Sequence, residues 1–217
     1  MMYDYNKRYD YENGFYATAG INRVSKFVAH LDLFRMVSRL RGEIVECGVF
    51  RGNSLFRWIK LRNLLENMYS RKVIAFDTFA HFPETSFELD KKERELFISE
   101  TKGGLSLSRD EIVFLLEKQN LNHNIELIEG NILYTAKDYV AKNPQLKISL
   151  LHVDVDIYEA TKAVLEVFYP HVVRGGCIIF DDYGDFAGAN KAVDDYFNNI
   201  NILKLSYANA ISYIVKK

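Results

Sequence analysis

Strand-like and helical segments alternate along most of this chain, and the alternation limits the possible folds more than any other feature of the sequence. Runs of strand-forming apolar residues occupy positions 43–47, 72–76, 125–128, 148–153 and 177–180. Apolar residues with helical spacing lie between them, at 54–67, 110–120, 132–142 and 158–169. Five such units in succession predict a doubly wound α/β fold, in which a parallel sheet with right-handed crossovers carries helices on both faces.

The two ends of the chain complete this predicted fold. A helix is expected over 23–41, before the first strand, and another near 189–199. The last two strand-like runs, 202–205 and 211–215, are joined by only five residues, "SYANA", which are too few for a helical crossover. They predict an antiparallel hairpin that closes a mostly parallel, seven-stranded sheet. With 217 residues, of which 48% are hydrophobic, the chain suits a single domain, 1–217.

The balance of charges argues against a nucleic-acid or membrane partner. Lys and Arg total 28, Asp and Glu total 29, and no long run of like charges occurs. The N-terminus lacks the pattern of a signal peptide, and no stretch of about eighteen apolar residues is present, so a cytoplasmic location is expected. Cys47 and Cys177 both fall in apolar strand-like runs, where buried, reduced thiols are expected.

In an open α/β sheet, ligands bind beyond the carboxyl ends of the strands. The first strand ends in "ECGVFRGNS", where Gly48 and Gly52 permit a tight turn close to a ligand, and Asn53 or Ser54 is expected to cap the next helix. The dinucleotide fingerprint G-x-G-x-x-G and the phosphate-binding G-x-x-x-x-G-K-[ST] are both absent, which argues against NAD and ATP. Glu46, just before the first glycine, instead suits a ligand with a positive charge.

The next two strands also end in residues that could bind a cofactor. Asp77, in "FDTFAHFPET", is placed where a carboxylate would hold the 2′- and 3′-hydroxyls of a ribose. Gly130 and Asn131, in "ELIEGNI", would let a flat adenine approach the backbone. Structural alternatives exist, because Glu46 could cap a helix and Asp77 could start a turn. Their positions at the ends of consecutive parallel strands favour a shared binding role.

Two pairs of aspartates follow the fourth and fifth strands, in "HVDVDIYEA" and "CIIFDDYGD". If the chain stays extended to residue 156, alternation puts Asp154 and Asp156 on one face with His152. Asp181 and Asp182 reach the same point only if their strand breaks there. Such close carboxylates raise one another's pKa unless a cation neutralises them, and an oxygen-only set selects Mg²⁺ or Mn²⁺. The alternative is that the second pair caps a turn and Asp156 caps the following helix.

Several of these blocks together resemble one protein family. "GEIVECGVFRGNS", "FDTFAHFPET", "HVDVDIYEAT" and "GGCIIFDDYGD", followed by "ANKAVDDYF", are similar to the macrocin O-methyltransferases, metal-dependent enzymes that use S-adenosylmethionine to methylate sugars of macrolides and aminocoumarins. The resemblance extends from about residue 13 to the C-terminus, with the blocks in the same order at the same strand ends. It implies a class I methyltransferase fold of the Rossmann-like type.

The resemblance also implies a role for each candidate residue. Three aspartates match the metal ligands of the family: Asp154, Asp181 and Asp182. Two acidic residues match its cofactor contacts: Glu46 and Asp77. Asp156, the second Asp of the D-x-D motif, matches the general base. The implied cofactors are S-adenosylmethionine and Mg²⁺ or Mn²⁺, and the implied acceptor is a small molecule with a hydroxyl group.

Three histidines are alternative candidates for the general base. Ile157 stands where the catalytic lysine of the distantly similar catechol-type enzymes would be expected, and this supports a carboxylate base. His81 lies in a loop that could reach substrate, His152 in a strand and His171 near a turn. These histidines rank below Asp156.

Two segments outside the predicted sheet remain open in function. The leader, 1–21, carries five tyrosines in its first sixteen residues and suits a substrate lid, an aromatic platform for a sugar, a contact between two copies of the chain, or a frayed tail. The charged insertion at 84–109 contains Gly103 and Gly104 and is the predicted lid and specificity region.

The leading interpretation is a Mg²⁺-dependent O-methyltransferase that acts on a hydroxyl of a sugar or of a glycosylated metabolite. The alternative is a non-catalytic protein of the same fold that binds S-adenosylmethionine as a partner subunit or sensor. Four clustered aspartates favour the enzyme, because binding alone needs no base beside a metal. Methylation of nucleic acid is disfavoured by the charge balance and by the absence of a basic stripe.

Overall fold

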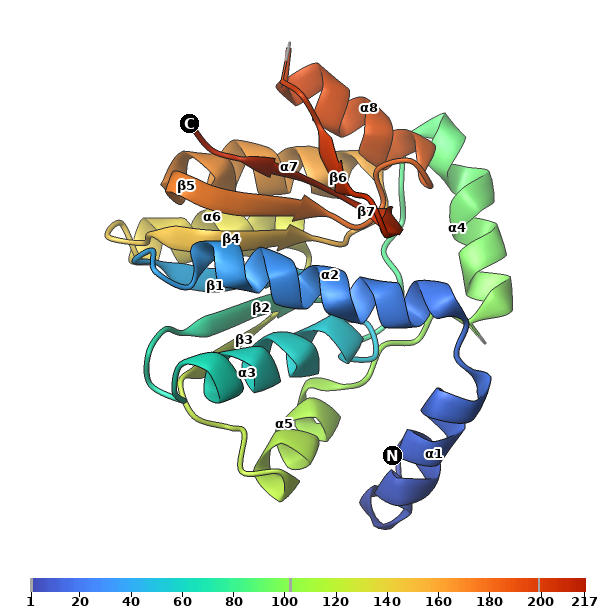
Figure 1. Ribbon diagram of the computed structural model, residues 1–217. Coiled ribbons are helices and arrows are strands. Elements are labelled where there is room, and N and C mark those ends of the chain that lie inside the picture. Colours follow the sequence, from blue (N-terminus) through green and yellow to red (C-terminus); the bar gives the residue numbers. More distant parts are fainter. Residues whose placement is uncertain (1, 102, 199) are drawn as a thin grey trace.

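A computed structural model describes residues 2–101, 103–198 and 200–217 of the chain (Figure 1). Residues 1, 102 and 199 lie outside the described part. They fall within the predicted leader, the predicted insertion and the end of the helix expected at 189–199.

The described residues form a seven-stranded sheet with the strand order β3-β2-β1-β4-β5-β7-β6. The first five strands run parallel, and β7 is antiparallel to both β5 and β6. This arrangement confirms the predicted doubly wound sheet with its C-terminal hairpin. The strands are β1 Glu43–Cys47, β2 Val73–Asp77, β3 Ile125–Glu129, β4 Ile148–Val153, β5 Val172–Phe180, β6 Leu203–Leu205 and β7 Ala208–Val215.

Helices cover both faces of the sheet (Figure 1). One apolar cluster joins α2, α3 and α5 to the first face, and a second joins α6, α7 and α8 to the other. Strand β1 serves both clusters, because Ile44 points into the first and Val45 into the second. The helices are α1 Arg8–Thr18, α2 Ile21–Val37, α3 Asn53–Leu65, α4 Glu88–Glu100, α5 Arg109–Lys118, α6 Ile132–Lys142, α7 Tyr158–Phe168 and α8 Ala187–Tyr196, with short 3₁₀ turns η1 Tyr5–Lys7 and η2 Tyr169–His171.

Two helices lie where the sequence predicted none. The leader forms η1 and α1, which extends away from the sheet, and the insertion contains α4 beside the carboxyl ends of the strands (Figure 1). Helix α1 has no buried residue and only a weak apolar face. Its sequence therefore lacks the helical spacing of apolar residues from which a helix could be predicted. Residues 5–18 of the leader are thus helical, and the role of the leader stays a prediction.

The hairpin and the core also add detail to the prediction. Strand β5 begins at Val172 and β7 at Ala208, so the last connection is shorter than the expected five residues. Cys47 and Cys177 are buried free thiols, as predicted. Among the described residues, no helix combines the length and the apolar character needed to cross a membrane.

Candidate active site

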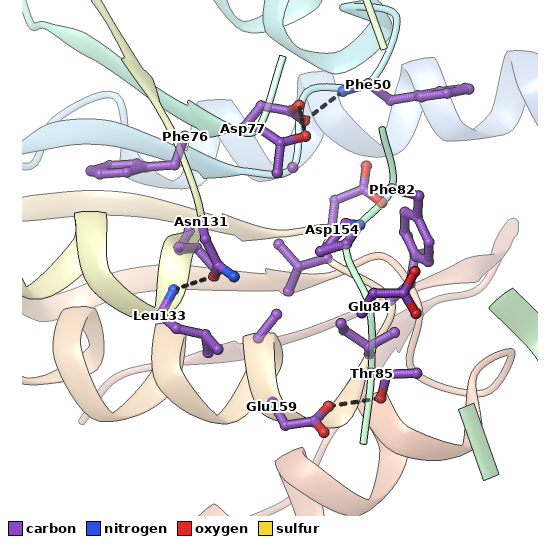
Figure 2. Close-up of a pocket in the computed structure, with 18 of the residues that line it drawn as sticks. Phe50, Phe76, Asp77, Phe82, Glu84, Thr85, Asn131, Leu133, Asp154 and Glu159 are labelled. Carbon is purple, nitrogen blue, oxygen red and sulfur yellow. Dashed lines mark hydrogen bonds between the residues drawn. The ribbon is translucent and has the colours of Figure 1, made fainter. Parts of the chain in front are cut away.

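A cavity of about 430 Å³ lies at the carboxyl ends of β1, β2, β3 and β4 (Figure 2). Four of the predicted residues that follow these strands line it: Gly48, Asp77, Gly130 and Asp154. Asn131 and Asp156 line it as well. The strand ends thus meet at one place, as expected for a doubly wound sheet, and the volume is within the range of small-molecule sites.

Gly48 is required by the close approach of two strand ends. Its φ is +93°, and a Cβ at this position would lie 1.6 Å from the carbonyl oxygen of Asp154. A larger residue would push the β1 loop away from the end of β4. The glycine therefore fixes the distance between the predicted cofactor loop and the D-x-D motif.

Asp77 already has partners within the chain. Its Oδ2 accepts hydrogen bonds from the backbone N–H groups of Val49, at 2.7 Å, and Phe50, at 2.9 Å (Figure 2). Its Oδ1 accepts from the N–H of Phe79 at 2.7 Å and from the hydroxyl of Ser106 at 3.2 Å. The carboxylate holds the β1 loop in position, and its contact with a ribose remains a prediction.

Three other predicted cofactor residues do not line this cavity. Gly52, with φ +80°, is the N-cap of α3, and neither Asn53 nor Ser54 makes the expected capping bond. The predicted cap is therefore wrong, and Ser54 is buried inside the first turn of the helix. Glu46 is fully buried, with Oε1 lying 3.3 Å from Nδ1 of His152 and Oε2 without a hydrogen-bond partner among the described residues.

Asp154, Asp156 and Asp182 form an acidic cluster beside the cavity, which we call the aspartate trio. One carboxylate oxygen from each lies within 4.8 Å of the others. Strand β4 ends at Val153, and Asp156 has a left-handed φ of +59°, so the assumption of an extended chain to residue 156 was wrong. The turn brings the backbone N–H of Asp156 to 3.0 Å from Oδ2 of Asp182.

Among the described residues, no cationic side chain forms an ion pair with the trio, and Lys26 and His152 offset its repulsion only in part. Burial, followed by the charge of Asp154, raises the pKa of Asp156 to about 7. Burial and neighbouring carboxylates also raise the pKa values of Asp154 and Asp182 well above the usual range. The alternative role of Asp156 as the cap of the next helix is wrong, since the N-cap of α7 is Ile157 and makes no side-chain bond.

Asp181 lies in a different electrostatic environment from the trio. Its Oδ2 forms an ion pair with Lys26 of α2, and its Oδ1 lies 3.6 Å from Nε2 of His152. Although burial opposes it, the pKa of Asp181 is lowered by His152 and Lys26. Despite its own burial, His152 has a pKa raised to about 10 by Asp181 and Glu46. We call these residues the paired network: Lys26, Glu46, His152 and Asp181.

The three rival histidines are poor candidates for the base. His152 is fully buried and protonated at neutral pH, so it cannot accept a proton. His171 precedes β5, at the opposite edge of the sheet from the cavity. His81 is exposed in the segment that pairs with Leu105, and it does not line the cavity. Of the predicted bases, Asp156 lines the cavity.

The predicted lid region is tied to the domain by two acidic residues. Glu159, in the first turn of α7, accepts hydrogen bonds from Thr85 Oγ1 at 2.9 Å and from the N–H of Phe87 at 3.0 Å (Figure 2). Asp90 of α4 is buried and accepts from the N–H of Tyr158 at 2.7 Å. Both carboxylates are absent from the sequence-based predictions, because an acidic residue in the first turn of a helix ordinarily points into solvent.

Lys26 was also missed. It lies within a helical pattern that predicts only packing, and its partner Asp181 is 155 residues away. No pattern in a single sequence indicates that Lys26 and Asp181 are in contact. A lysine one residue before Phe27, on a helix that precedes the first strand, is ordinarily read as part of a solvated face.

The donor sets fit the two cofactors that the resemblance implies. The trio offers only carboxylate oxygens, as Mg²⁺ and Mn²⁺ prefer, and the buried Oδ1 of Asp181 has no hydrogen-bond partner among the described residues. The cavity is mainly apolar, and the polar side chains of Asp77, Asn131 and Asp154 lie at separate places around it (Figure 2). Such a site suits a ligand with one flat apolar part and a polar part near the trio.

The sheet order and the position of the cavity define a class I methyltransferase fold. In solved structures, CalS11, a calicheamicin methyltransferase, matches with a TM-score of 0.73 and 25% identity over 94% of this chain and 83% of its own. The O-methyltransferase NovP matches with a TM-score of 0.73 and 21% identity over 91% of this chain and 80% of its own.

The chain belongs to the macrocin-O-methyltransferase (TylF) family, whose sequence profile matches residues 6–207. A relative in Streptomyces olivaceus, 8-demethyl-8-(2,3-dimethoxy-alpha-L-rhamnosyl)-tetracenomycin-C 4'-O-methyltransferase, is 30% identical over 157 residues. Demethyldecarbamoylnovobiocin O-methyltransferase of Streptomyces niveus is 28% identical over 160 residues. Both alignments cover 71% of this chain, which spans 58% of the length of either relative. The family suspected from the sequence blocks is thereby confirmed.

Proposed function

We propose that this chain is a Mg²⁺-dependent O-methyltransferase that transfers the methyl group of S-adenosylmethionine to a hydroxyl of a sugar or glycosylated metabolite. The observation that carries the proposal is the aspartate trio, three clustered carboxylates beside a cavity at the strand ends. Membership in the family supports the reaction class, and the relative from Streptomyces olivaceus is named for methylation of a rhamnosyl-tetracenomycin.

The residues divide into cofactor and metal roles. S-adenosylmethionine would occupy the cavity, with Gly48, Gly130 and Asn131 at its walls and Asp77 behind the β1 loop. Three aspartates are the proposed metal ligands: Asp154, Asp181 and Asp182. When bound, Mg²⁺ lowers the pKa of a hydroxyl that it coordinates and fixes the position of that hydroxyl.

Asp156 is the proposed general base. Its carboxylate lies among the trio and lines the cavity, so it faces the space in which an acceptor hydroxyl would approach the cofactor. In the metal-free chain, burial and the charge of Asp154 raise the pKa of Asp156 to about 7, so this carboxyl group can hold a proton near neutral pH. The chain would then contribute proton removal and the holding of both reactants at contact distance, and the second effect is the larger one for methyl transfer.

The first test is methyl transfer itself. The purified chain, given isotopically labelled S-adenosylmethionine, Mg²⁺ and a panel of nucleotide sugars, glycosides and catechols, should label a sugar-bearing acceptor. EDTA should abolish the transfer, and Mg²⁺ or Mn²⁺ should restore it. Asp154→Asn should lose activity, whereas Asp138→Asn, an exposed α6 carboxylate, should not. Full turnover in EDTA would refute the metal-dependent proposal.

A further inference from the structure

Helix α4 is bonded to the first turns of two other helices by a pair of acidic side chains, Asp90 and Glu93, which we call the anchor pair. Asp90 is fully buried, and its Oδ2 accepts a hydrogen bond at 2.7 Å from the N–H of Tyr158, the first residue of α7. Oε2 of Glu93 accepts a hydrogen bond at 3.1 Å from the N–H of Ala187, the first residue of α8. One helix of the insertion thus joins the beginnings of α7 and α8.

These bonds take the place of ordinary helix caps. Ile157 and Phe186 are the N-cap residues of α7 and α8, and neither side chain makes a capping hydrogen bond. The first N–H groups of a helix have no partner within the helix, and a carboxylate beside them is favoured both by hydrogen bonding and by the helix dipole. The anchor pair therefore supplies the acceptors that these two N-cap residues do not.

Gly188, the second residue of α8, is fitted to the carboxylate of Asp90. A Cβ at this position would lie 2.1 Å from both carboxylate oxygens of Asp90, far inside contact distance. Because every other residue carries a Cβ, only glycine leaves room here for the buried carboxylate. The first turn of α8 and the anchor pair are thus matched in shape as well as in hydrogen bonding.

The two helices that the anchor pair joins follow residues 154–156 and 181–182, which we call the aspartate loops. Tyr158 comes two residues after Asp156, and the carbonyl of Asp182 accepts from the N–H of Phe186, the N-cap of α8. The N–H of Asp156 in turn donates to Oδ2 of Asp182 at 3.0 Å, from one loop to the other. A shared apolar cluster packs the bodies of α7 and α8, whereas the anchor pair fixes their first turns, which lie nearest the aspartates.

We propose that Asp90 and Glu93 are positioning residues, which hold the two aspartate loops together in their metal-binding arrangement by joining α7 to α8 through α4. The inference rests on the proposed function, because it gives these residues a role in the proposed metal site. Neither residue lines the cavity, so both act through the loops and not on a ligand. The carboxylates of the aspartate trio repel one another, so the metal-free loops need contacts outside the site to stay together.

Hydrogen exchange of the Asp156 amide, followed by NMR in the metal-free full chain, tests this directly, because that N–H is bonded across the two aspartate loops. Asp90→Ala should speed this exchange about five- to thirtyfold, the factor expected for loss of a helix cap. Asp110→Ala, which removes an exposed carboxylate from the first turn of α5, should leave it within about twofold. The amide of Leu133, in the first turn of α6, should exchange at its wild-type rate in both variants.

Gly188→Ala is a second variant, which leaves the anchor pair in the sequence. Its new Cβ should displace the Asp90 carboxylate and speed exchange of the Asp156 amide as Asp90→Ala does. In an Asp90→Ala background, the same change should add less than about a twofold effect, because the carboxylate that it displaces is gone. Two results would overturn the proposal: an Asp156 amide that exchanges equally fast in Asp90→Ala and wild type, or additive effects of the two substitutions.

Calorimetry with Mg²⁺ distinguishes this inference from the proposed function. Asp90→Ala should weaken Mg²⁺ binding about five- to thirtyfold, because only the fraction of chains with the loops together is competent to bind, and saturating Mg²⁺ should restore kcat. If wild type binds Mg²⁺ and Asp90→Ala binds it equally well, the positioning role fails while the proposed function stands. If wild type binds no Mg²⁺ while Asp90→Ala still speeds exchange at Asp156, the metal-dependent function fails and the anchor pair still holds the loops.

Discussion

Two groups of buried carboxylates lie side by side at the strand ends, and they differ in whether the chain supplies a cation. In the paired network, Lys26 and His152 accompany Asp181 and Glu46, and the pKa of Asp181 is lowered. In the aspartate trio the neighbours are mostly other carboxylates, and all three pKa values are raised. A charged aspartate is thus stabilised by its neighbours in the paired network and destabilised by its neighbours in the aspartate trio.

This difference identifies the group that an external cation should occupy. A folded chain ordinarily pairs a buried charge, and a cluster left unpaired is destabilising unless a ligand completes it. The paired network contains its own cations and therefore supports the site, while Oδ1 of Asp181, without a hydrogen-bond partner among the described residues, is left free for a metal ion. The aspartate trio contains residues proposed to bind the metal ion and to remove the proton.

The largest effect should come from Asp156, the member of the trio assigned to proton transfer. Asp156→Asn should lower kcat by about 10²–10⁴-fold, the range for loss of a positioned general base, while Mg²⁺ and S-adenosylmethionine still bind. Single-turnover kinetics alongside calorimetry would measure both. A variant with normal kcat at saturating Mg²⁺ and weakened metal binding would instead make Asp156 a ligand and reopen the assignment of the base.

Much of this comparison could be anticipated from the sequence, and one part could not. The strand ends that carry Asp77, Asp154 and Asp182 follow from the alternation of strands and helices, because parallel strands place their carboxyl ends at one edge. The separate environment of Asp181 depends on Lys26, which reaches it across 155 residues of chain. Single-sequence patterns carry no signal for a contact at that separation.

The segment 84–109, which contains α4, likewise could not be predicted in detail from a single sequence. Helix α4 has a mostly charged sequence, and it is held by Asp90 and by the hydrogen bonds of the preceding loop to Glu159. Tertiary contacts of this kind, rather than an apolar periodicity, fix the helix in place, so the sequence predicted only an insertion. The Glu46 carboxylate likewise lies against His152 and not in the cavity wall, although its position near the end of β1 suggested a contact with a ligand.

Breaking the paired network should cost stability rather than chemistry. His152→Leu removes the cation between Glu46 and Asp181 and should lower the free energy of unfolding by about 3–5 kcal/mol, the range for a buried charge left without its partner. His81→Leu, at an exposed position, should change it by less than about 0.5 kcal/mol. Urea unfolding would measure both, and equal midpoints would show that the network does not support the fold.

The pH dependence of stability should follow the trio in metal-free protein. The pKa of Asp156 is about 7 in the folded chain and near its ordinary acidic value when unfolded, so the folded state holds an extra proton between these values. Metal-free stability should therefore fall as pH rises from about 4.5 to 7.5. Asp181, whose pKa is lowered, contributes stability that is lost only at lower pH.

Urea midpoints measured across this pH range, with and without Mg²⁺, would show whether stability falls or rises with pH. Saturating Mg²⁺ should flatten the decline, and Asp156→Asn should reduce its slope in the metal-free protein. A metal-free midpoint that rises steadily over this range would mean that the trio is neutralised within the chain.

The smallest expected effect is a change in Mg²⁺ affinity when Lys26, the partner of Asp181, is replaced. Lys26→Met should strengthen Mg²⁺ binding by about three- to tenfold, because the ammonium group competes for a carboxylate oxygen of Asp181 and repels the ion. Lys137→Met, an exposed change on α6, should have no effect. Thermal shift against Mg²⁺ concentration would separate these variants, and weaker binding in Lys26→Met would make the lysine part of the metal site.

The most direct test of the central claim is a calorimetric titration of Mg²⁺ into wild type, Asp154→Asn and Asp138→Asn, each with S-adenosylmethionine present. One Mg²⁺ should bind per wild-type chain, with an affinity at least about tenfold weaker in Asp154→Asn and unchanged in Asp138→Asn. Equal Mg²⁺ affinity in all three proteins would contradict the assignment of Asp154 as a metal ligand.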